Sequence, residues 1–137
     1  MTVAEAQRIW SYEKTEGGTI RLVSYRGREE EVVVPDRIGK IAVTEIGGHA
    51  FSPRGNTSED VKRRREKIRS VLVPEGVVKL GEYTFTKCGA LACVQLPDSM
   101  TEIGSFAFGG CTSLTDISIP DHVTRIGEYA FDGCTVH

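Results

Sequence analysis

A 23-residue repeat is the feature of this sequence that most restricts its fold. Three segments starting at residues 71, 94 and 117 read VLVPEGVVKLGEYTFTKCGAL, VQLPDSMTEIGSFAFGGCTSL and ISIPDHVTRIGEYAFDGCTVH. Four residue types keep this period in all three copies: Pro74, Pro97 and Pro120; Gly81, Gly104 and Gly127; Phe85, Phe108 and Phe131; Cys88, Cys111 and Cys134. A period in the low twenties is typical of a solenoid, in which each unit buries its apolar face only by stacking on the next.

An earlier and less regular copy, VVVPDRIGKIAVTEIGGHAF, occupies residues 32–51. It has five extra residues between Pro35 and Gly47, and eleven extra residues follow it. We therefore expect a solenoid over residues 32–137 with about four rungs, an insertion near residues 52–69 and a truncated last rung. The preceding 31 residues do not repeat.

Each repeat begins with alternating apolar residues that end at a proline, as a half-buried strand does. The inward pairs are Val32 and Val34, Val71 and Val73, Val94 and Leu96, and Ile117 and Ile119. These strands are expected to form a narrow parallel sheet. After the proline, the spacing of apolar residues predicts a bend at the glycine and then a short helical turn.

Residues 1–31 predict an N-terminal cap. The segments IWSYEK and TIRLVSY flank the turn sequence TEGG, a pattern typical of a β-hairpin. The hairpin supplies enough apolar surface to cover an open solenoid end, through Trp10, Tyr12, Ile20, Leu22 and Tyr25. The segment before it is expected to be a frayed or short helical terminus.

The repeat resembles the leucine-rich repeats of the BspA-like family, whose unit runs approximately LxxIxIPxxVxxIGxxAFxxC. Residues 71–134 match throughout and residues 32–51 match with an insertion, although Thr84 and Leu80 replace the family's Ala and Ile. The resemblance implies an α/β fold, a right-handed leucine-rich-repeat solenoid with a narrow parallel sheet, short helical turns and here an N-terminal β-hairpin cap. It also implies a non-catalytic protein-binding or adhesion module. Family members are commonly secreted or cell-surface bacterial proteins. The first residues of this sequence, MTVAEAQRIWSYEK, lack the apolar segment of a signal peptide. The sequence therefore does not predict a localisation.

Catalytic, metal and cofactor sites are not predicted. The sequence contains no CxxC pair, no phosphate-binding glycine loop and no nucleophile or zinc motif, and His49, His122 and His137 are far apart. A weak alternative is an enzyme site assembled from His49, His122 and the acids of the rungs. The three cysteines of the repeat are expected to be reduced and buried, with Cys93 outside their column, exposed and reactive.

The insertion contains the basic run KRRREKIR, whose charge of +5 lies between flanks of −2 and −5. Ser58 is a suitable N-cap for a short helix there, with Val61 and Ile68 on one face. One interpretation is contact with an anionic surface or nucleic acid through Lys62, Arg63, Arg64, Arg65, Lys67 and Arg69. The other is a solvated insertion. Nucleic acid is disfavoured because no aromatic residues interleave the basic ones and the chain carries a net charge of −2.

Two further surfaces are candidates for binding a protein partner. One is an aromatic column just before each buried Ala-Phe pair, formed by His49, Tyr83, Phe106 and Tyr129. The other is the outward face of the predicted sheet, formed by Val33, Leu72, Gln95 and Ser118 and flanked by Glu31, Ser70, Cys93 and Asp116. For each, the alternative is packing between rungs without a binding role.

The last rung is a candidate site of self-association. It offers Ile126, Phe131 and Cys134 beside the free edge of the strand Ile117–Ile119, and bare edges of this kind pair with other chains. We expect either a fragment of a longer solenoid or two copies that meet end to end in a two-fold contact. No apolar run reaches the roughly 20 residues of a membrane-spanning helix.

Overall fold

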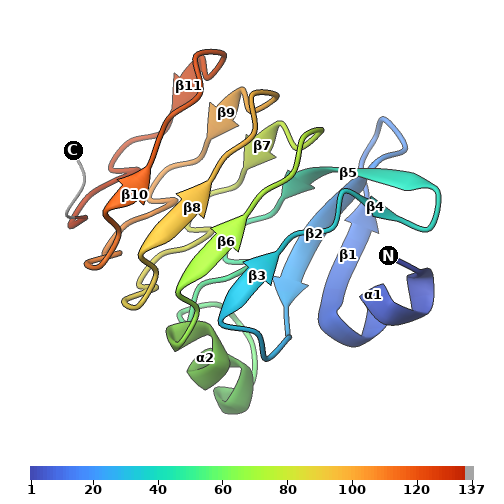
Figure 1. Ribbon diagram of the computed structural model, residues 1–137, viewed down its shortest axis with the longest axis horizontal. Helices are drawn as coiled ribbons and strands as arrows, with labels where there is room; N and C mark the ends of the chain where they lie inside the picture. The colour runs from blue at the N-terminus through green and yellow to red at the C-terminus, as the bar shows by residue number, and fades with distance from the viewer. Residues whose placement is uncertain (135–137) are drawn as a thin grey trace.

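The computed structural model describes residues 1–134, which form a solenoid with two sheets in separate layers (Figure 1). The four-stranded sheet contains the predicted strands, β3 (Glu31–Val33), β6 (Ser70–Leu72), β8 (Cys93–Gln95) and β10 (Asp116–Ile117). Neighbouring strands are parallel and pair at equivalent positions of the repeat, for example Val71 with Val94. The solenoid and its narrow parallel sheet are therefore as predicted.

A second sheet was not predicted. It runs in the order β1 (Trp10–Lys14), β2 (Ile20–Tyr25), β5 (Ile41–Ile46), β7 (Lys79–Leu80), β9 (Glu102–Ile103) and β11 (Arg125–Ile126), and β4 (Arg37–Ile38) pairs with β5. In each regular repeat, the strand of this second sheet consists of the two residues before the conserved glycine. Close stacking requires that glycine, since a Cβ on Gly104 would lie 2.5 Å from the carbonyl carbon of Gly81.

The hydrophobic core of the solenoid contains a column of stacked phenylalanines. The ring centroids of Phe51 and Phe85 are 4.8 Å apart, those of Phe85 and Phe108 5.2 Å, and those of Phe108 and Phe131 5.3 Å. Each phenylalanine lies in a segment of consecutive hydrogen-bonded turns. In the last rung, Ala130 N donates to Gly127 O and Cys134 N donates to Phe131 O. These turns occupy the place of the predicted helical turn.

The cysteine column lies beside the phenylalanine stack and is reduced, as predicted. Each thiol donates to the carbonyl of the phenylalanine one rung earlier, and the three bonds, from Cys88, Cys111 and Cys134, are 3.3, 3.1 and 2.7 Å long. Burial is the main cause that raises the pKa of all three thiols, to about 12 for Cys111. Cys93, expected to be exposed, is half-buried on β8.

At the N-terminus, β1 and β2 form the predicted antiparallel hairpin. Trp10 and Tyr25 cover the first ring of the stack, with centroids 5.6 and 5.4 Å from that of Phe51. Because β2 also pairs in parallel with β5, the hairpin extends the larger sheet. The terminus before it is the short helix α1 (Val3–Ile9), closed by a capping box between Thr2 and Glu5.

The insertion contains the helix α2 (Glu59–Glu66), with Ser58 as its N-cap. Val61 and Ile68 are buried, as the sequence predicts. In Figure 1, α2 lies along one side of the solenoid next to the early rungs. Within residues 1–134, neither helix has the length and apolar character needed to cross a membrane.

Candidate functional site

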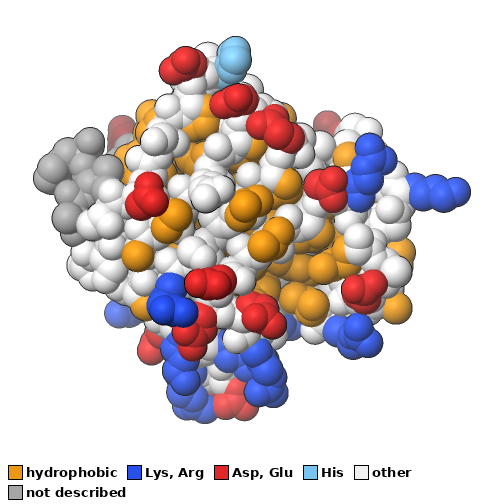
Figure 2. All heavy atoms as spheres, in the orientation of Figure 1, with side chains coloured by type: hydrophobic (Ala, Val, Ile, Leu, Met, Phe, Trp, Pro, Cys, Tyr) orange, Lys and Arg blue, Asp and Glu red, His pale blue; other side chains and the backbone are white. Residues whose placement is uncertain are grey.

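The outward face of the four-stranded sheet changes in character along the solenoid. Val33 is 69 % exposed and Leu72 is 39 % exposed, and they lie opposite each other on β3 and β6. The next two residues of the column, Gln95 and Ser118, are exposed and polar. Figure 2 views this face and shows hydrophobic side chains gathered over its middle and its N-terminal part. The column therefore has an apolar half and a polar half.

Acidic residues border this face on both sides. One margin holds Glu30 and Glu31, which pair with Arg69 at 3.3 and 3.9 Å. The other margin holds the exposed acid that follows each proline: Asp36, Glu75, Asp98 and Asp121. Figure 2 shows acidic side chains in the upper part of this view. The signal for these acids in the sequence is the Pro-acid pair of every repeat, which sequence reasoning missed.

A shallow hollow crosses the apolar half of the face. Val33, Leu72 and Gln95 line it together with Glu31 and Cys93. Burial, followed by the hydrogen bond and charge of Asp116, raises the pKa of the Cys93 thiol. The face thus presents a recessed apolar strip, a half-buried neutral thiol and acidic margins.

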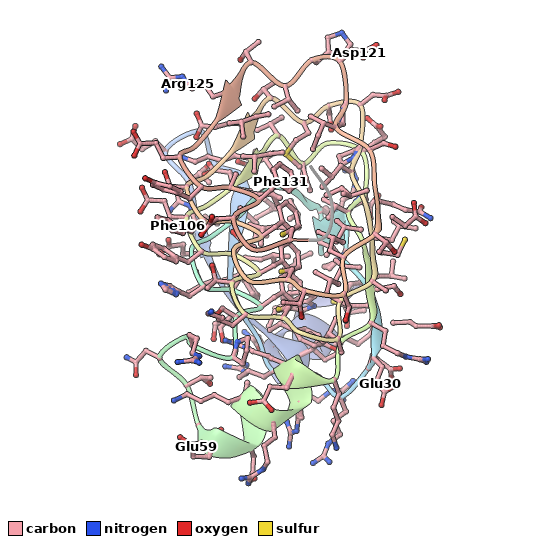
Figure 3. The ribbon with its side chains drawn as sticks, turned by 90° about the vertical axis from the view of Figure 1, so that its left-hand side faces the viewer. Glu30, Glu59, Phe106, Asp121, Arg125 and Phe131 are labelled. Carbon is pink, nitrogen blue, oxygen red and sulfur yellow. The ribbon has the colours of Figure 1, made fainter. Side chains whose placement is uncertain are left out.

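The aromatic column is a continuous stack on the flank of the rungs. Ring centroids are 5.0 Å apart between His49 and Tyr83, 5.1 Å between Tyr83 and Phe106, and 5.1 Å between Phe106 and Tyr129. Figure 3 shows Phe106 on the outer flank and Phe131 inside the rung. All four residues have positive φ between 56° and 61°, a conformation that costs a side chain about 1 kcal/mol or more. The column is mostly half-buried, and Tyr129 is 61 % exposed.

The side chain of Arg65 lies in the interior of the protein, where it is 1 % exposed. The prediction that it belongs to a basic surface with the other residues of the run is therefore wrong. The guanidinium donates to the carbonyls of Tyr25, His49 and Ser52 and to the hydroxyl of Ser24, at 3.1, 3.2, 2.8 and 2.7 Å. Burial lowers the pKa of this guanidinium to about 10. Arg65 therefore fastens α2 to the first rung.

Three of the other basic residues of the insertion, Lys62, Arg63 and Arg69, form ion pairs with nearby acids. Lys62 and Arg63 pair with Glu59 and Asp60 on the same helix. Arg64 donates to the carbonyl of Arg26, and Arg69 pairs with the acids of β3 and its preceding residue. Lys67 is exposed. The accessible positive charge is thus smaller than the run of six basic residues suggests.

The histidines do not come together. His49 stacks on Tyr83, whereas His122 is exposed beside Asp121 at the far margin of the sheet face, and His137 lies outside the described residues. In residues 1–134 there is no group of three His, Cys, Asp or Glu side chains placed to hold a metal ion. The weak alternative of an enzyme site thus gains no support from this arrangement.

A ladder of alternating charge crosses the outer face of the larger sheet, and sequence reasoning missed it. One residue from each of six neighbouring strands lies at the same register, and acid alternates with base along the whole row: Glu13, Arg21, Glu45, Lys79, Glu102 and Arg125. A signal exists in the three regular repeats, where Lys79, Glu102 and Arg125 follow one another at intervals of 23 residues. Glu13, Arg21 and Glu45 come from irregular segments without a common spacing.

Ion pairs join most neighbours in this charge ladder. Arg21 lies 2.7 Å from Glu13 and 3.3 Å from Glu45. Glu102 lies 3.2 Å from Lys79 and 3.6 Å from Arg125. Opposite charges on adjacent strands stabilise a sheet by about 0.2 to 1 kcal/mol per pair. The ladder therefore reinforces the register of the larger sheet.

The stacked strands, the glycine column and the phenylalanine column define a leucine-rich-repeat solenoid. The chain belongs to the BspA-type leucine-rich-repeat family, since the family model described as a BspA type leucine rich repeat region with 6 copies matches residues 63–137. No curated protein sequence matches the chain.

Solved bacterial leucine-rich-repeat structures are similar to the whole fold. A leucine rich cell surface protein from Faecalibacterium prausnitzii is 26 % identical with a TM-score of 0.76, over 90 % of this chain and 32 % of that one. A leucine-rich repeat protein from Bacteroides ovatus is 29 % identical with a TM-score of 0.76, over 93 % of this chain and 32 % of that one. A third, from Bacteroides capillosus, is 26 % identical with a TM-score of 0.75, over 93 % and 92 %. The chain thus spans about a third of the first two proteins and nearly all of the third.

Proposed function

We propose that this chain is a non-catalytic protein-binding module whose partner docks on the outward face of the four-stranded sheet. The observation that supports this most is the exposure of Val33 and Leu72 side by side on β3 and β6. An exposed apolar strip within a polar rim is typical of a protein interaction site. Because acids border the strip on both sides, the partner segment is expected to present an apolar side chain between basic ones.

An adhesive role at a cell surface is part of the same proposal. It is supported by the family of the chain and by the similarity to the Faecalibacterium prausnitzii protein, which is named a cell surface protein. The repeat solenoid suits this role because its stacked strands present an extended and rigid face.

Cys93 allows a direct test because its thiol lies within the proposed face. A benzophenone attached to this thiol is irradiated in the presence of proteins from the surroundings of the source cell. We expect discrete adducts that disappear in Val33→Asp and Leu72→Asp but persist in Val23→Asp. Val23 is a matched control because it is 38 % exposed on β2 of the other sheet.

A second label position provides the outcome that contradicts the proposal. The same benzophenone is placed on α2 by Glu66→Cys in a Cys93→Ser background. If both label positions give the same adducts, or if the Val33→Asp and Leu72→Asp variants keep them, the sheet face is not the binding surface.

The alternative is contact with an anionic surface or nucleic acid through the insertion. With Arg65 buried and Lys62, Arg63 and Arg69 paired with acids, few free charges support it. A salt titration distinguishes the two functions: binding that weakens by orders of magnitude between low and moderate salt favours the insertion.

A further inference from the structure

The two edges of the larger sheet are complementary in charge. Within residues 1–134, β1 pairs only with β2 and β11 pairs only with β9, so each has one side without a strand partner. Figure 1 shows α1 on that side of β1. The charge ladder begins with Glu13 at the β1 edge and ends with Arg125 at the β11 edge. We propose that copies of this chain associate head to tail, with the β11 edge of one copy beside the β1 edge of the next.

The residues at these edges are accessible. The side chain of Arg125 is 80 % exposed and that of Glu13 is 54 % exposed. In the proposed contact they become neighbours, and the alternation of acid and base continues from one copy into the next without interruption. Facing charges of opposite sign favour this contact over others.

An apolar row behind the charge ladder continues in the same way. The residues adjacent to the ladder members point to the interior and pair across the same strands: Tyr12, Leu22, Ile46, Leu80, Ile103 and Ile126. Its two ends are incompletely covered, since Ile126 is 52 % exposed and Tyr12 is half-buried. Head-to-tail contact places these two side chains together and removes apolar surface from water.

The chain already contains the proposed pairing. Within one copy, β1 lies antiparallel to β2 with Glu13 opposite Arg21 and Tyr12 opposite Leu22. The β11 edge presents the same order, an arginine followed by a large aliphatic residue, in Arg125–Ile126. In the proposed contact, β1 of the second copy therefore lies beside β11 of the first copy. The side chains that it faces there have the same order as those of its own β2.

Strand direction is consistent with this arrangement. The strands from β2 to β11 are all parallel, and β1 is antiparallel to them. Translation along the solenoid axis therefore brings β1 of the next copy antiparallel to β11, as it is to β2. A translated contact does not close on itself, so the product is an open row of copies whose length grows with concentration.

The same charges disfavour a two-fold contact in which two copies meet end to end. In a two-fold contact through β11, the Arg125 side chains of both copies approach each other. Like charges on neighbouring strands are destabilising. The charge ladder therefore distinguishes between the two modes of self-association.

The test exchanges the charges at the two edges and measures association by sedimentation velocity over a concentration series at low salt. Arg125→Glu places two acids at the junction and Glu13→Arg places two bases there. We expect each variant alone to associate about tenfold more weakly than the unchanged chain. An equimolar mixture of the two variants restores association, since each junction then joins an acid to a base. Added salt weakens the association of the unchanged chain.

Arg54→Glu and Glu66→Arg are the matched controls, because both change the charge of an exposed residue away from the two edges. They are expected to associate like the unchanged chain. Glu13→Gln replaces Glu13→Arg if the hairpin does not fold, as judged by thermal unfolding. The proposal is overturned if the unchanged chain stays monomeric at every concentration. It is also overturned if Glu13→Arg has no effect while Arg125→Glu does, because that result indicates a two-fold contact.

Discussion

Two aromatic stacks run along the solenoid with nearly the same ring spacing and very different surroundings. The inner stack contains Phe85 and Phe108, which are fully buried between the sheets. The outer stack contains Tyr83 and Phe106, which are half-buried on the flank and have positive φ. Centroid distances are 5.2 Å between the inner pair and 5.1 Å between the outer pair.

The comparison shows that ring spacing does not report the contribution of a stack to stability. The rise per rung sets the spacing, because parallel strands are about 4.8 Å apart. Burial sets the free energy, since the inner rings are removed from water on all sides and the outer rings on some. The positive φ of the outer residues opposes their contribution further.

The largest expected effect tests the inner stack. Phe108→Ala is expected to reduce the free energy of unfolding by about 3 to 5 kcal/mol, because it leaves a cavity between Phe85 and Phe131. Phe106→Ala, two residues earlier, is expected to cost less than about 1 kcal/mol, because the ring is only half-buried and its removal takes less apolar surface from the core. Urea denaturation of both variants measures the difference. Equal losses would show that the two stacks contribute alike.

A substitution of Arg65 tests how much this side chain stabilises the turn that contains the first residue of each stack. Its guanidinium binds the carbonyl of His49 and that of Ser52, which follows Phe51. Arg65→Ala is expected to cost about 2 to 4 kcal/mol, because buried carbonyls lose their donors. Arg63→Ala, with an exposed ion pair on the same helix, is expected to cost less than about 0.5 kcal/mol. Chemical denaturation compares them, and similar losses would contradict a clamping role for Arg65.

The thiols provide a pH test of the inner region. The folded pKa of Cys111 is about 12, above the value of roughly 8.5 for an exposed thiol, so the unfolded chain loses this proton first as the pH rises. Stability is therefore complete below pH 8.5 and falls above it. The free energy of unfolding of the unchanged chain therefore decreases between about pH 8 and 10. We expect Cys111→Ala to make this decrease smaller by about 2 kcal/mol. Above that range, the lowered pKa of Arg65 acts in the opposite direction.

Cys93→Ala is the comparison for this measurement, because Cys93 is half-buried on the sheet face and not in the column. Since the pKa of the Cys93 thiol is also raised, Cys93→Ala is expected to change the loss of stability in the same direction but by less than Cys111→Ala. Denaturation midpoints at several pH values give the slopes. A slope that Cys111→Ala leaves unchanged would show that the column thiols ionise as readily in the folded chain as in the unfolded chain.

The smallest expected effect tests backbone strain in the outer stack. Phe106→Gly is expected to be more stable than Phe106→Ala by about 0.5 to 1 kcal/mol, because glycine adopts a positive φ without a steric penalty. At Glu128, which is exposed and has no positive φ, the order of Gly and Ala is expected to reverse. Thermal unfolding of the four variants checks both signs. If Phe106→Ala is more stable than Phe106→Gly, the positive φ at this position costs no free energy.

Much of the rung could be predicted from the sequence alone. The recurrence of Phe85 and Cys88 at one period places them at one lateral position, and their apolar character places them inside. The strands before Pro74 and Pro97 alternate clearly, so their inward residues are also predictable. Ser58, Val61 and Ile68 are sufficient to indicate the helix in the insertion.

The candidate sites were less predictable. The strands of the larger sheet in the regular repeats, such as Lys79–Leu80, are too short to show an alternating pattern. The basic run of the insertion gives no sign that Arg65 differs from its neighbours. Its burial depends on the carbonyls of Tyr25 and Ser52, which are distant in sequence and meet only in the fold.

The sequence by itself determined the columns of this protein, because a constant period brings the same residue to the same side of every rung. Only the tertiary structure decided which segments of unequal length lie side by side. The register between β2 and β5, and that between β5 and β7, join irregular segments to the repeats and so align Arg21, Glu45 and Lys79. The opposite charges at the two ends of the larger sheet follow from that alignment, since pairing between strands depends on packing in space and not on distance along the chain.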